Sequence, residues 1–377
     1  MPLYVNLELL YIGDNVRIMK RRNFIFLVLA LLAVTVLSGG FFSRFIAPSL
    51  AGLDTQEYPP VFDTLIEPLQ MAAGAIKSLT MPRRTYSYAN PMVGKTLYVE
   101  PYTSALNQAN AWEATRPQDA QDMQFLASQP RAVWIGSWNT DPGSAVRSIL
   151  QQSNAQKAVP VFVAYNVPSF SCEAYLQNPK QVSADYMQWL NNFAAGIGTS
   201  TAVIILEPDA LAGRECLKAK RNNLIKQAVV VLKRNPNAIV YIDAGHGTWN
   251  TIDAMSQKLK NGGIDLADGF ALNVSNFQYN SVTTPYGAEL SARVKNKHFV
   301  IDTSRNGEVS TPLNYEWCNP PGRALGATPT STTNHPLVDA FLWIKQPGES
   351  DGTCNGGPDA GLWWPEYALE LVQNSRP

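Results

Sequence analysis

The chain has 377 residues, of which 45% are hydrophobic and 16% charged, so it is long enough for a large folded domain and unlike a disordered protein. Lys plus Arg and Asp plus Glu both number 30, which excludes the basic surplus of a nucleic-acid-binding protein. With three His, four Cys and neither a CxxC nor an HExxH pattern, we expect no metal site and no cofactor.

The N-terminal segment has the design of an export signal. Residues 19–40 begin with a basic MKRR, continue with a long apolar run and end in small residues, as secretory signal peptides do. We predict that this segment is cleaved and that the protein is secreted. Because no clean A-x-A cleavage site is present, a retained signal anchor in the inner membrane, with the protein facing outward, is the alternative. Residues 1–18 fit no signal design, and we interpret them as a mis-assigned start or a short extension.

The hydrophobic pattern of the sequence changes near residue 90. Residues 41–89 have weak periodicity and scattered prolines, which is typical of a linker-like arm. Residues 90–377 are predicted to form one catalytic domain, which we expect to be monomeric. Helix-like stretches such as 183–197 and 223–234 separate seven apolar runs, at 131–138, 158–167, 201–209, 237–246, 269–277, 297–307 and 339–348. This alternation predicts an α/β fold whose parallel sheet closes into a barrel.

The third run, AVIILEPDALAG at 202–213, turns acidic where the strand is expected to end. Pro208 lies between Glu207 and Asp209 and stiffens the exit from the strand. A helix N-cap formed by Asp209 is one explanation of this pattern. Other predicted strands also end in polar residues, namely Asp243 with His246, Asn273 with Asn276, Asp302 with Arg305, and Lys345 with Glu349 and Asp351. In a parallel barrel all these ends lie at one face, where such folds place their chemistry.

The residue types at these strand ends restrict the chemistry. The sequence has no GxSxG, no P-loop and no cysteine in a catalytic context, and it is rich in aromatic residues, with nine Trp and fifteen Tyr. Hydrolysis of a glycosidic bond needs one carboxyl group to protonate the leaving oxygen and a second to activate water or attack the sugar. Carboxylates, amides and indoles at one face therefore favour a glycoside hydrolase.

Six motifs extend this hypothesis: IILEPDALA, YIDAGHGTW, NVSNF, DTSRNG, EWCNPPGRALG and WIKQPGESDG. With these motifs the chain from about residue 90 resembles glycoside hydrolase family 6 (cellulase family B), the inverting β-1,4-glucanases that include endoglucanases and cellobiohydrolases. The resemblance implies a distorted, TIM-like barrel of seven parallel strands. It also implies two sequential disulfides, Cys172–Cys216 and Cys318–Cys354, whereas four cysteines in an exported chain by themselves allow three pairings.

Matching the motifs residue by residue implies roles for single side chains. Asp209 corresponds to the general acid and Asp351 to the proposed base. Such an acid keeps its proton near neutral pH only if burial or a neighbouring carboxylate raises its pKa. For each Trp taken alone, core packing is an equally good explanation. The residues expected to bind the glucan are Tyr165, Trp134, Asp243, His246, Trp249, Asn276, Trp317, Lys345 and Glu349.

One segment, YNVPSFSCEAY, departs from the family. Relatives commonly carry an Arg-Asp pair just before this cysteine, and that aspartate helps to keep the general acid protonated. The matching positions here are Phe170 and Ser171, and a hydroxyl group supplies no like charge. Glu173 could replace it only if the loop bends differently. Three outcomes are open: hydrolysis with a shifted acid limb, strongly reduced hydrolysis, or a sugar-binding protein without activity.

The segments that would cover the substrate are short, both after Cys172 and between Asp351 and the last predicted helix. Short loops leave an open groove, which favours cuts inside a glucan chain over attack at its ends. We therefore predict a secreted, inverting endo-β-1,4-glucanase that acts on β-1,4-glucan or cello-oligosaccharides. A catalytically weakened or non-catalytic β-glucan-binding homologue and an exo-acting cellobiohydrolase are the alternatives.

Overall fold

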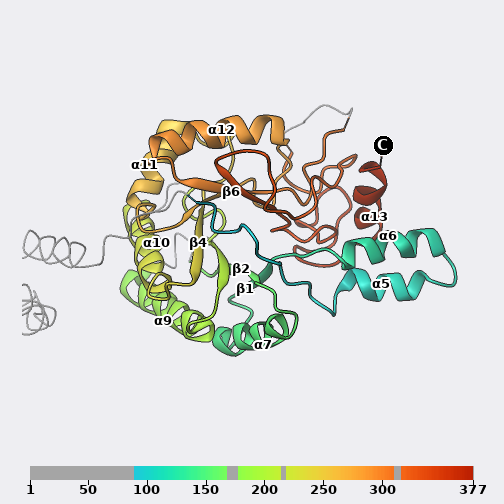
Figure 1. Cartoon of the computed structure of the whole chain (residues 1–377), viewed down its shortest axis with the longest axis horizontal. Coiled ribbons are helices and arrows are strands. Elements are labelled where there is room, and N and C mark those ends of the chain that lie inside the picture. The colour runs from blue at the N-terminus through green and yellow to red at the C-terminus, as the bar shows by residue number, and fades with distance from the viewer. Residues whose placement is uncertain (1–88, 168–176, 214–217, 310–315, 377) are drawn as a thin grey trace, which may run out of the picture. The chain divides into compact units, whose positions relative to one another are not determined.

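The computed structural model describes residues 89–167, 177–213, 218–309 and 316–376 (Figure 1). Its centre is one sheet of seven parallel strands in chain order, in which each strand pairs with the next. Six strands lie inside the predicted apolar runs and the last begins one residue earlier, so the prediction of seven strands is confirmed. The strands are β1 (Val133–Gly136), β2 (Val161–Tyr165), β3 (Ala202–Leu206), β4 (Ala238–Asp243), β5 (Gly269–Leu272), β6 (His298–Asp302) and β7 (Val338–Leu342).

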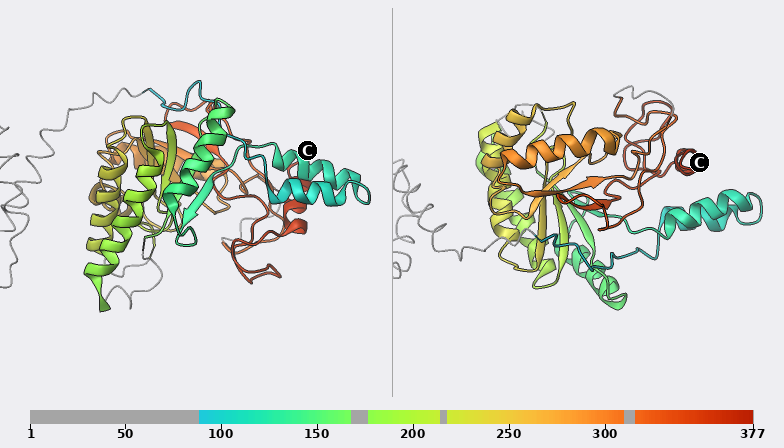
Figure 2. Two further views of the ribbon diagram at one scale, coloured as in Figure 1. Left: turned by 90° about the horizontal axis from the view of Figure 1, so that it is seen from below. Right: turned by 45° about the horizontal axis from the view of Figure 1, so that its top comes forward.

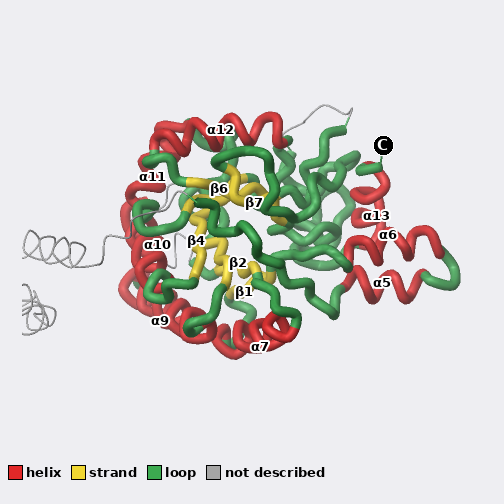
Figure 3. Tube along the Cα trace, in the orientation of Figure 1, coloured by secondary structure: helices red, strands yellow, loops and turns green. Residues whose placement is uncertain are grey.

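Within the described residues, five helices connect successive strands from β1 to β6 and form an arc around the outside of the sheet (Figure 3). On the side toward α13 (Pro365–Asn374), long loops occupy the place of this helical layer. The prediction of a distorted, TIM-like α/β barrel is thereby confirmed. The connecting helices are α7 (Pro142–Ala155), α9 (Pro179–Ile197), α10 (Lys218–Leu232), α11 (Ile252–Asn261) and α12 (Asn280–Arg293).

The barrel is open between its first and last strands. In the described part of the chain no ladder joins β1 to β7. Single hydrogen bonds connect the two edges instead: the amide of Ala132 donates to the carbonyl oxygen of Trp343 at 2.9 Å. The indole Nε1 of Trp134 donates to the carbonyl oxygen of Ile344 at 2.8 Å. These bonds hold the exit of β7 against the start of β1.

The helix starts are fixed by local capping. In α9, the side chain of Asn178 accepts a hydrogen bond from the amide of Gln181 at 3.3 Å, and Pro179 occupies the first helical position. Asp141 and Pro142 play the same roles in α7. The apolar periodicity of α9 begins later than its cap, which is why the pattern predicts a start at residue 183.

Apolar side chains cover both faces of the sheet. Val203 and Ile205 of β3 pack with Tyr241 in a core formed mainly by the strands themselves. Ile204 and Leu206 pack on the opposite face, in the core shared with the surrounding helices. A strand buried on both faces reads as a continuous apolar run rather than an alternating one, as residues 202–206 do.

A helical hairpin lies outside the barrel. Helices α5 (Ser104–Trp112) and α6 (Pro117–Ala127) run side by side and project away from the sheet on the side of α13 (Figure 2). A third core joins the hairpin to α13, and the fully buried indole of Trp343, directly after β7, lies in it. This core anchors the loops that follow β7.

The segments N-terminal to residue 89 lie outside the described residues. The signal at 19–40, the arm up to residue 88 and the domain boundary therefore stay predictions. Among the described helices, none combines the length and the hydrophobicity that crossing a membrane requires.

Candidate active site

The acidic exit of β3 begins with a buried carboxylate that holds a neighbouring loop. Glu207 is buried, and its Oε2 accepts hydrogen bonds from the amides of Asn166 at 2.9 Å and Val167 at 2.7 Å. Burial raises the pKa of Glu207 to about 8. Since Asn166 and Val167 directly follow β2, Glu207 ties the exits of β2 and β3 together.

Asp209, the predicted general acid, is partly buried next to this anchor. Burial raises the pKa of its carboxyl group to about 6. Its backbone has a φ of 69°, in the left-handed region that non-glycine residues seldom adopt. Residues 208–212 form turns, so no helix begins at Asp209 and the helix-cap explanation is wrong.

Asp243 at the end of β4 lies directly against Asp209. Its buried Oδ2 accepts hydrogen bonds from the amides of Asp209 at 3.0 Å and Gly245 at 3.2 Å. Burial, followed by the charge of Asp209, raises the pKa of Asp243 well above its usual range. The exits of β3 and β4 thus bring Asp209 and Asp243 together, as predicted. Contact of Asp243 with a sugar stays a prediction.

Aromatic rings surround the end of β2. Tyr165 meets Trp134 edge to face, with ring centroids 5.3 Å apart. Burial raises the pKa of Tyr165 above its usual range, and the charge of Asp209 is the next cause, so the tyrosine lies close to the acid. Trp138 lies 6.4 Å from Tyr165 between ring centroids and is 58% exposed. Trp138 ends the first apolar run, but it lies in none of the six family motifs and is not among the predicted glucan-binding residues.

A second aromatic surface follows β4. The rings of His246 and Trp249 have centroids 5.5 Å apart, and the indole is 39% exposed. Burial lowers the pKa of His246 to about 4, so the imidazole is neutral at physiological pH. Its Nδ1 shares a hydrogen bond with the hydroxyl of Thr248 at 2.9 Å. Trp249 thus presents a flat apolar face beside a neutral polar ring.

A second buried carboxylate organises the exits of β5, β6 and β7. Asp302 at the end of β6 accepts hydrogen bonds from the amides of Ser275 and Ser304 at 3.0 Å, Lys345 at 2.9 Å and Ile344 at 3.2 Å. Burial raises its pKa. With four backbone donors around it, Asp302 acts as a structural anchor.

The two asparagines after β5 also bond mainly to the backbone. Asn273 donates from Nδ2 to the carbonyl oxygen of Asp302 at 2.9 Å. Asn276 is partly exposed and donates from Nδ2 to the carbonyl oxygen of Val274 at 3.3 Å. Asn276 therefore lies beside the Asp302 anchor, and its predicted contact with a glucan stays a prediction.

Asp351, the predicted base, is held in a charged cluster at the exit of β7. The buried guanidinium of Arg305 donates from NH1 to Asp351 Oδ2 at 2.8 Å. The Nζ of Lys345 lies 3.9 Å from Asp351 Oδ1 and 3.8 Å from Glu349 Oε2. Burial lowers the pKa of Lys345 and raises that of Glu349. The structure therefore brings Lys345, Glu349 and Asp351 together, with Arg305 as a partner that the sequence placed at the neighbouring strand end.

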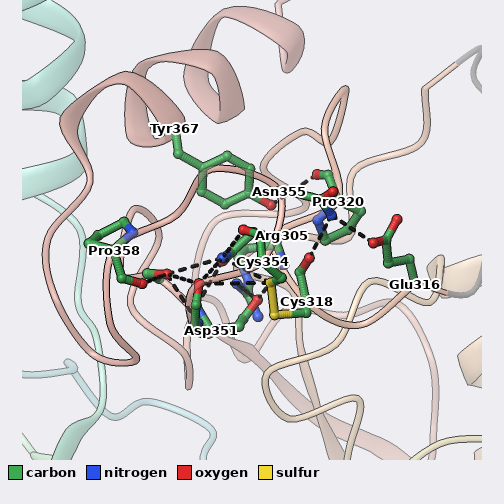
Figure 4. The surroundings of a disulfide bond; sticks show 12 residues. Arg305, Glu316, Cys318, Pro320, Asp351, Cys354, Asn355, Pro358 and Tyr367 are labelled. Carbon is green, nitrogen blue, oxygen red and sulfur yellow. Dashed lines mark hydrogen bonds and ion pairs between the residues drawn. A yellow bond between two sulfur atoms is a disulfide. The ribbon is translucent and has the colours of Figure 1, made fainter.

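A disulfide closes the loop that carries Asp351 (Figure 4). Cys318 and Cys354 are bonded, with Cα atoms 6.1 Å apart, so this pairing is confirmed. Trp317, the preceding residue, is 62% exposed, as a sugar-stacking surface requires. Cys172–Cys216 and the altered segment with Phe170, Ser171 and Glu173 lie outside the described residues, and those predictions stay open.

The described residues contain no group of three or more His, Cys, Asp or Glu side chains placed to hold a metal ion. What the site offers is two carboxyl groups in opposite environments. Burial raises the pKa of Asp209 and so favours its protonated form, whereas Asp351 forms an ion pair with the guanidinium of Arg305. Such a pair suits a reaction that needs one acid and one base.

Comparison with known proteins agrees with this chemistry. The family model for Glycosyl hydrolases family 6 matches residues 92–375. Endoglucanase A of Cellulomonas fimi is 40% identical over 291 residues, which cover 76% of this chain and 63% of that protein. The endoglucanase Cel6 of Mycobacterium tuberculosis, solved with methyl-cellobiosyl-4-deoxy-4-thio-β-D-cellobioside, superposes with a TM-score of 0.70 at 40% identity over 76% of this chain and 99% of that one. A 1,4-β-D-glucan cellobiohydrolase C of Emericella nidulans is 29% identical over 76% of this chain and 79% of that protein.

Proposed function

Since the chain belongs to glycosyl hydrolase family 6, we propose that it is an inverting endo-β-1,4-glucanase in which Asp209 is the general acid and Asp351 the base. The observation that carries this proposal is the carboxyl group of Asp209, whose pKa burial raises to about 6 at the carboxyl end of β3. An acid of this kind still holds its proton at the mildly acidic pH where an ordinary aspartate has lost it.

The proposed reaction is a single displacement. Asp209 donates its proton to the glycosidic oxygen as the bond to the anomeric carbon breaks, and a water molecule attacks that carbon from the opposite face. Asp351 accepts the proton that the water loses. Lys345 and Glu349, beside Asp351, bind hydroxyl groups of the sugar, while the rings of Trp134 and Trp249 support the chain on either side.

Action within the glucan chain is favoured over action at its ends. The endoglucanases from Cellulomonas fimi and Mycobacterium tuberculosis are both 40% identical to this chain, against 29% for the cellobiohydrolase. Viscometry separates the two modes. An endo-acting enzyme lowers the viscosity of carboxymethylcellulose well before many reducing ends appear, whereas an exo-acting enzyme releases reducing ends while the viscosity persists.

The decisive test of the mechanism is Asp209→Asn, which preserves size and the backbone hydrogen bond to Asp243. We expect no release of reducing ends from carboxymethylcellulose and an unchanged melting temperature. Asp185→Asn, an exposed aspartate on the outer helix α9, is the matched control and keeps full activity. Full activity of Asp209→Asn would refute the assignment of the acid.

The rival proposal is a β-glucan-binding protein without activity, because the altered segment around Ser171 removes a family carboxylate. Such a protein would quench its tryptophan fluorescence with cello-oligosaccharides and release no product between pH 4 and pH 8. We further propose secretion through the segment at 19–40, which N-terminal sequencing of protein from the culture medium would test.

A further inference from the structure

Asn319 and Asp351 bind each other in both directions. Asn319 directly follows Cys318 and is only 1% exposed. The backbone amide of Asn319 donates to Asp351 Oδ2 at 3.1 Å. Its side-chain Oδ1 accepts a hydrogen bond from the backbone amide of Asp351 at 2.7 Å. The carboxylate and the backbone of Asp351 are therefore fixed by the same residue.

The side-chain amide of Asn319 also binds the residues on either side of Asp351. Its Nδ2 lies 3.0 Å from Ser350 Oγ and 2.8 Å from the carbonyl oxygen of Gly352, and donates to both. The same Nδ2 lies 3.2 Å from the carbonyl oxygen of Cys354 and 3.3 Å from its Sγ, so the side-chain amide reaches the disulfide. Asn319 has a φ of 46°, a left-handed conformation in which asparagine is enriched.

These contacts distinguish the two oxygens of Asp351. Oδ2 accepts one hydrogen bond from Arg305 Nη1 at 2.8 Å and another from the backbone amide of Asn319. Oδ1 lies 3.9 Å from Lys345 Nζ, beyond hydrogen-bonding distance. With Oδ2 occupied by two donors, Oδ1 keeps its lone pairs for another partner.

We propose that Asn319 is a positioning residue that fixes the loop of Asp351, so that Oδ1 is the atom that takes the proton of the attacking water. The proposal rests on the proposed function and deepens it. In the step, the water oxygen bonds to the anomeric carbon while one water proton passes to Oδ1. The glycosidic bond breaks, and its oxygen takes the proton of Asp209. Solvent then restores both carboxyl groups to their starting states.

The first test is Asn319→Gly. Glycine adopts the left-handed backbone without strain and keeps the backbone amide, while the side-chain amide is lost. We expect kcat on soluble cello-oligosaccharides to fall on the order of 10²-fold, as for a reacting group displaced by about 1 Å, with KM almost unchanged. Asn235→Gly is the matched control. Asn235 also holds backbone, donating to the carbonyl oxygen of Ser200 at 2.8 Å, but it precedes β4 at the opposite end of the sheet, and we expect full activity.

The second test is Asn319→Asp, which keeps an acceptor for the Asp351 amide and adds a carboxylate beside Asp351. The added carboxylate disfavours a second negative charge next to it. Because the base must be ionised to act, the acid limb of the kcat profile should move to higher pH. A residue that only supports the fold would lower activity at every pH and leave the limb in place.

A crystal structure of Asn319→Gly completes the experiment. We expect the Asp351 carboxylate to shift by more than about 0.5 Å from its place against Arg305. An unmoved carboxylate, an unchanged kcat, or an equal loss in Asn235→Gly would overturn the positioning role. If the wild-type enzyme released no reducing ends from any β-glucan, the proposed function would fail, and the crystallographic shift would still decide whether Asn319 positions Asp351.

Discussion

Glu207 is the residue whose replacement tests the electrostatics of this site most directly. It is buried at the end of β3, and its carboxylate accepts hydrogen bonds from the amides of Asn166 and Val167. Burial nevertheless raises its pKa from 4.5 to about 8. The hydrogen bonds therefore fail to offset the cost of holding a charge away from water. In Glu207→Gln the side chain keeps its length and one oxygen acceptor but no longer titrates.

The sign of the effect follows from linkage. A carboxyl group whose pKa is higher in the folded protein binds its proton more tightly there, so it contributes stability at low pH that is lost as the pH rises toward 8. Between pH 5 and pH 8 this loss amounts to roughly 3 to 4 kcal/mol for Glu207. Glu207→Gln should remove that part of the pH dependence, whatever fixed amount of stability the substitution costs.

Urea unfolding followed by tryptophan fluorescence at pH 5 and pH 8 measures the effect. Between these pH values the free energy of unfolding should fall by roughly 3 to 4 kcal/mol more in the wild-type protein than in Glu207→Gln. Glu289→Gln, which replaces an exposed glutamate of α12, should behave like the wild type. If Glu207→Gln and the wild type lost equal stability between pH 5 and pH 8, Glu207 would not be a buried group that binds its proton more tightly in the folded protein.

Three further predictions concern activity and the disulfide. With a pKa of about 6 for Asp209, kcat/KM should fall about tenfold per pH unit above pH 6; a rate that stays level to pH 8 would contradict its role as acid. Replacing both Cys318 and Cys354 by Ser opens a crosslink over 36 residues and should lower the urea-derived free energy of unfolding by about 4 kcal/mol; a loss below about 1 kcal/mol would contradict this. Trp138→Ala should raise KM for long cello-oligosaccharides about fivefold and leave kcat unchanged, and an unchanged KM would show that this exposed ring touches no sugar.

The strands could be predicted from the sequence because most of them are buried on both faces, although Val133 and Trp134 of β1 are partly exposed. Residues such as Ile204 and Ile205 lie in different cores, so the whole of β3 reads as one apolar run. The hairpin of α5 and α6 left a weaker signal, since a helix that packs through few residues shows little periodicity. Its main attachment, the core around Trp343, joins segments that are distant in the chain and becomes visible only in three dimensions.

The sequence predicted which residues lie at the strand ends, and their hydrogen bonds in the structure show how these residues differ. Sequence places Glu207, Asp209 and Asp302 alike at strand ends, because a carboxylate that binds backbone amides and one that exchanges protons occupy the same edge of the sheet. Burial raises the pKa of all three, and the hydrogen bonds separate them: Glu207 and Asp302 accept from backbone amides of neighbouring strand exits, whereas Asp209 donates from its own amide to Asp243. Asn319 could not be recognised from the sequence, since its partner Asp351 is 32 residues away.

Residue 171 is a serine, so no carboxylate at that position helps Asp209 to hold its proton. Asp243 lies against the backbone of Asp209, and burial, followed by the charge of Asp209, raises the pKa of Asp243 well above its usual range. The buried Oδ1 of Asp243 meets no hydrogen-bond partner among the described residues, whereas its Oδ2 accepts from the amides of Asp209 and Gly245. Burial raises the pKa of Asp209 itself to about 6. A carboxylate at position 171 is then not needed for an active acid at mildly acidic pH, and hydrolysis is the outcome that we infer for this departure from the family.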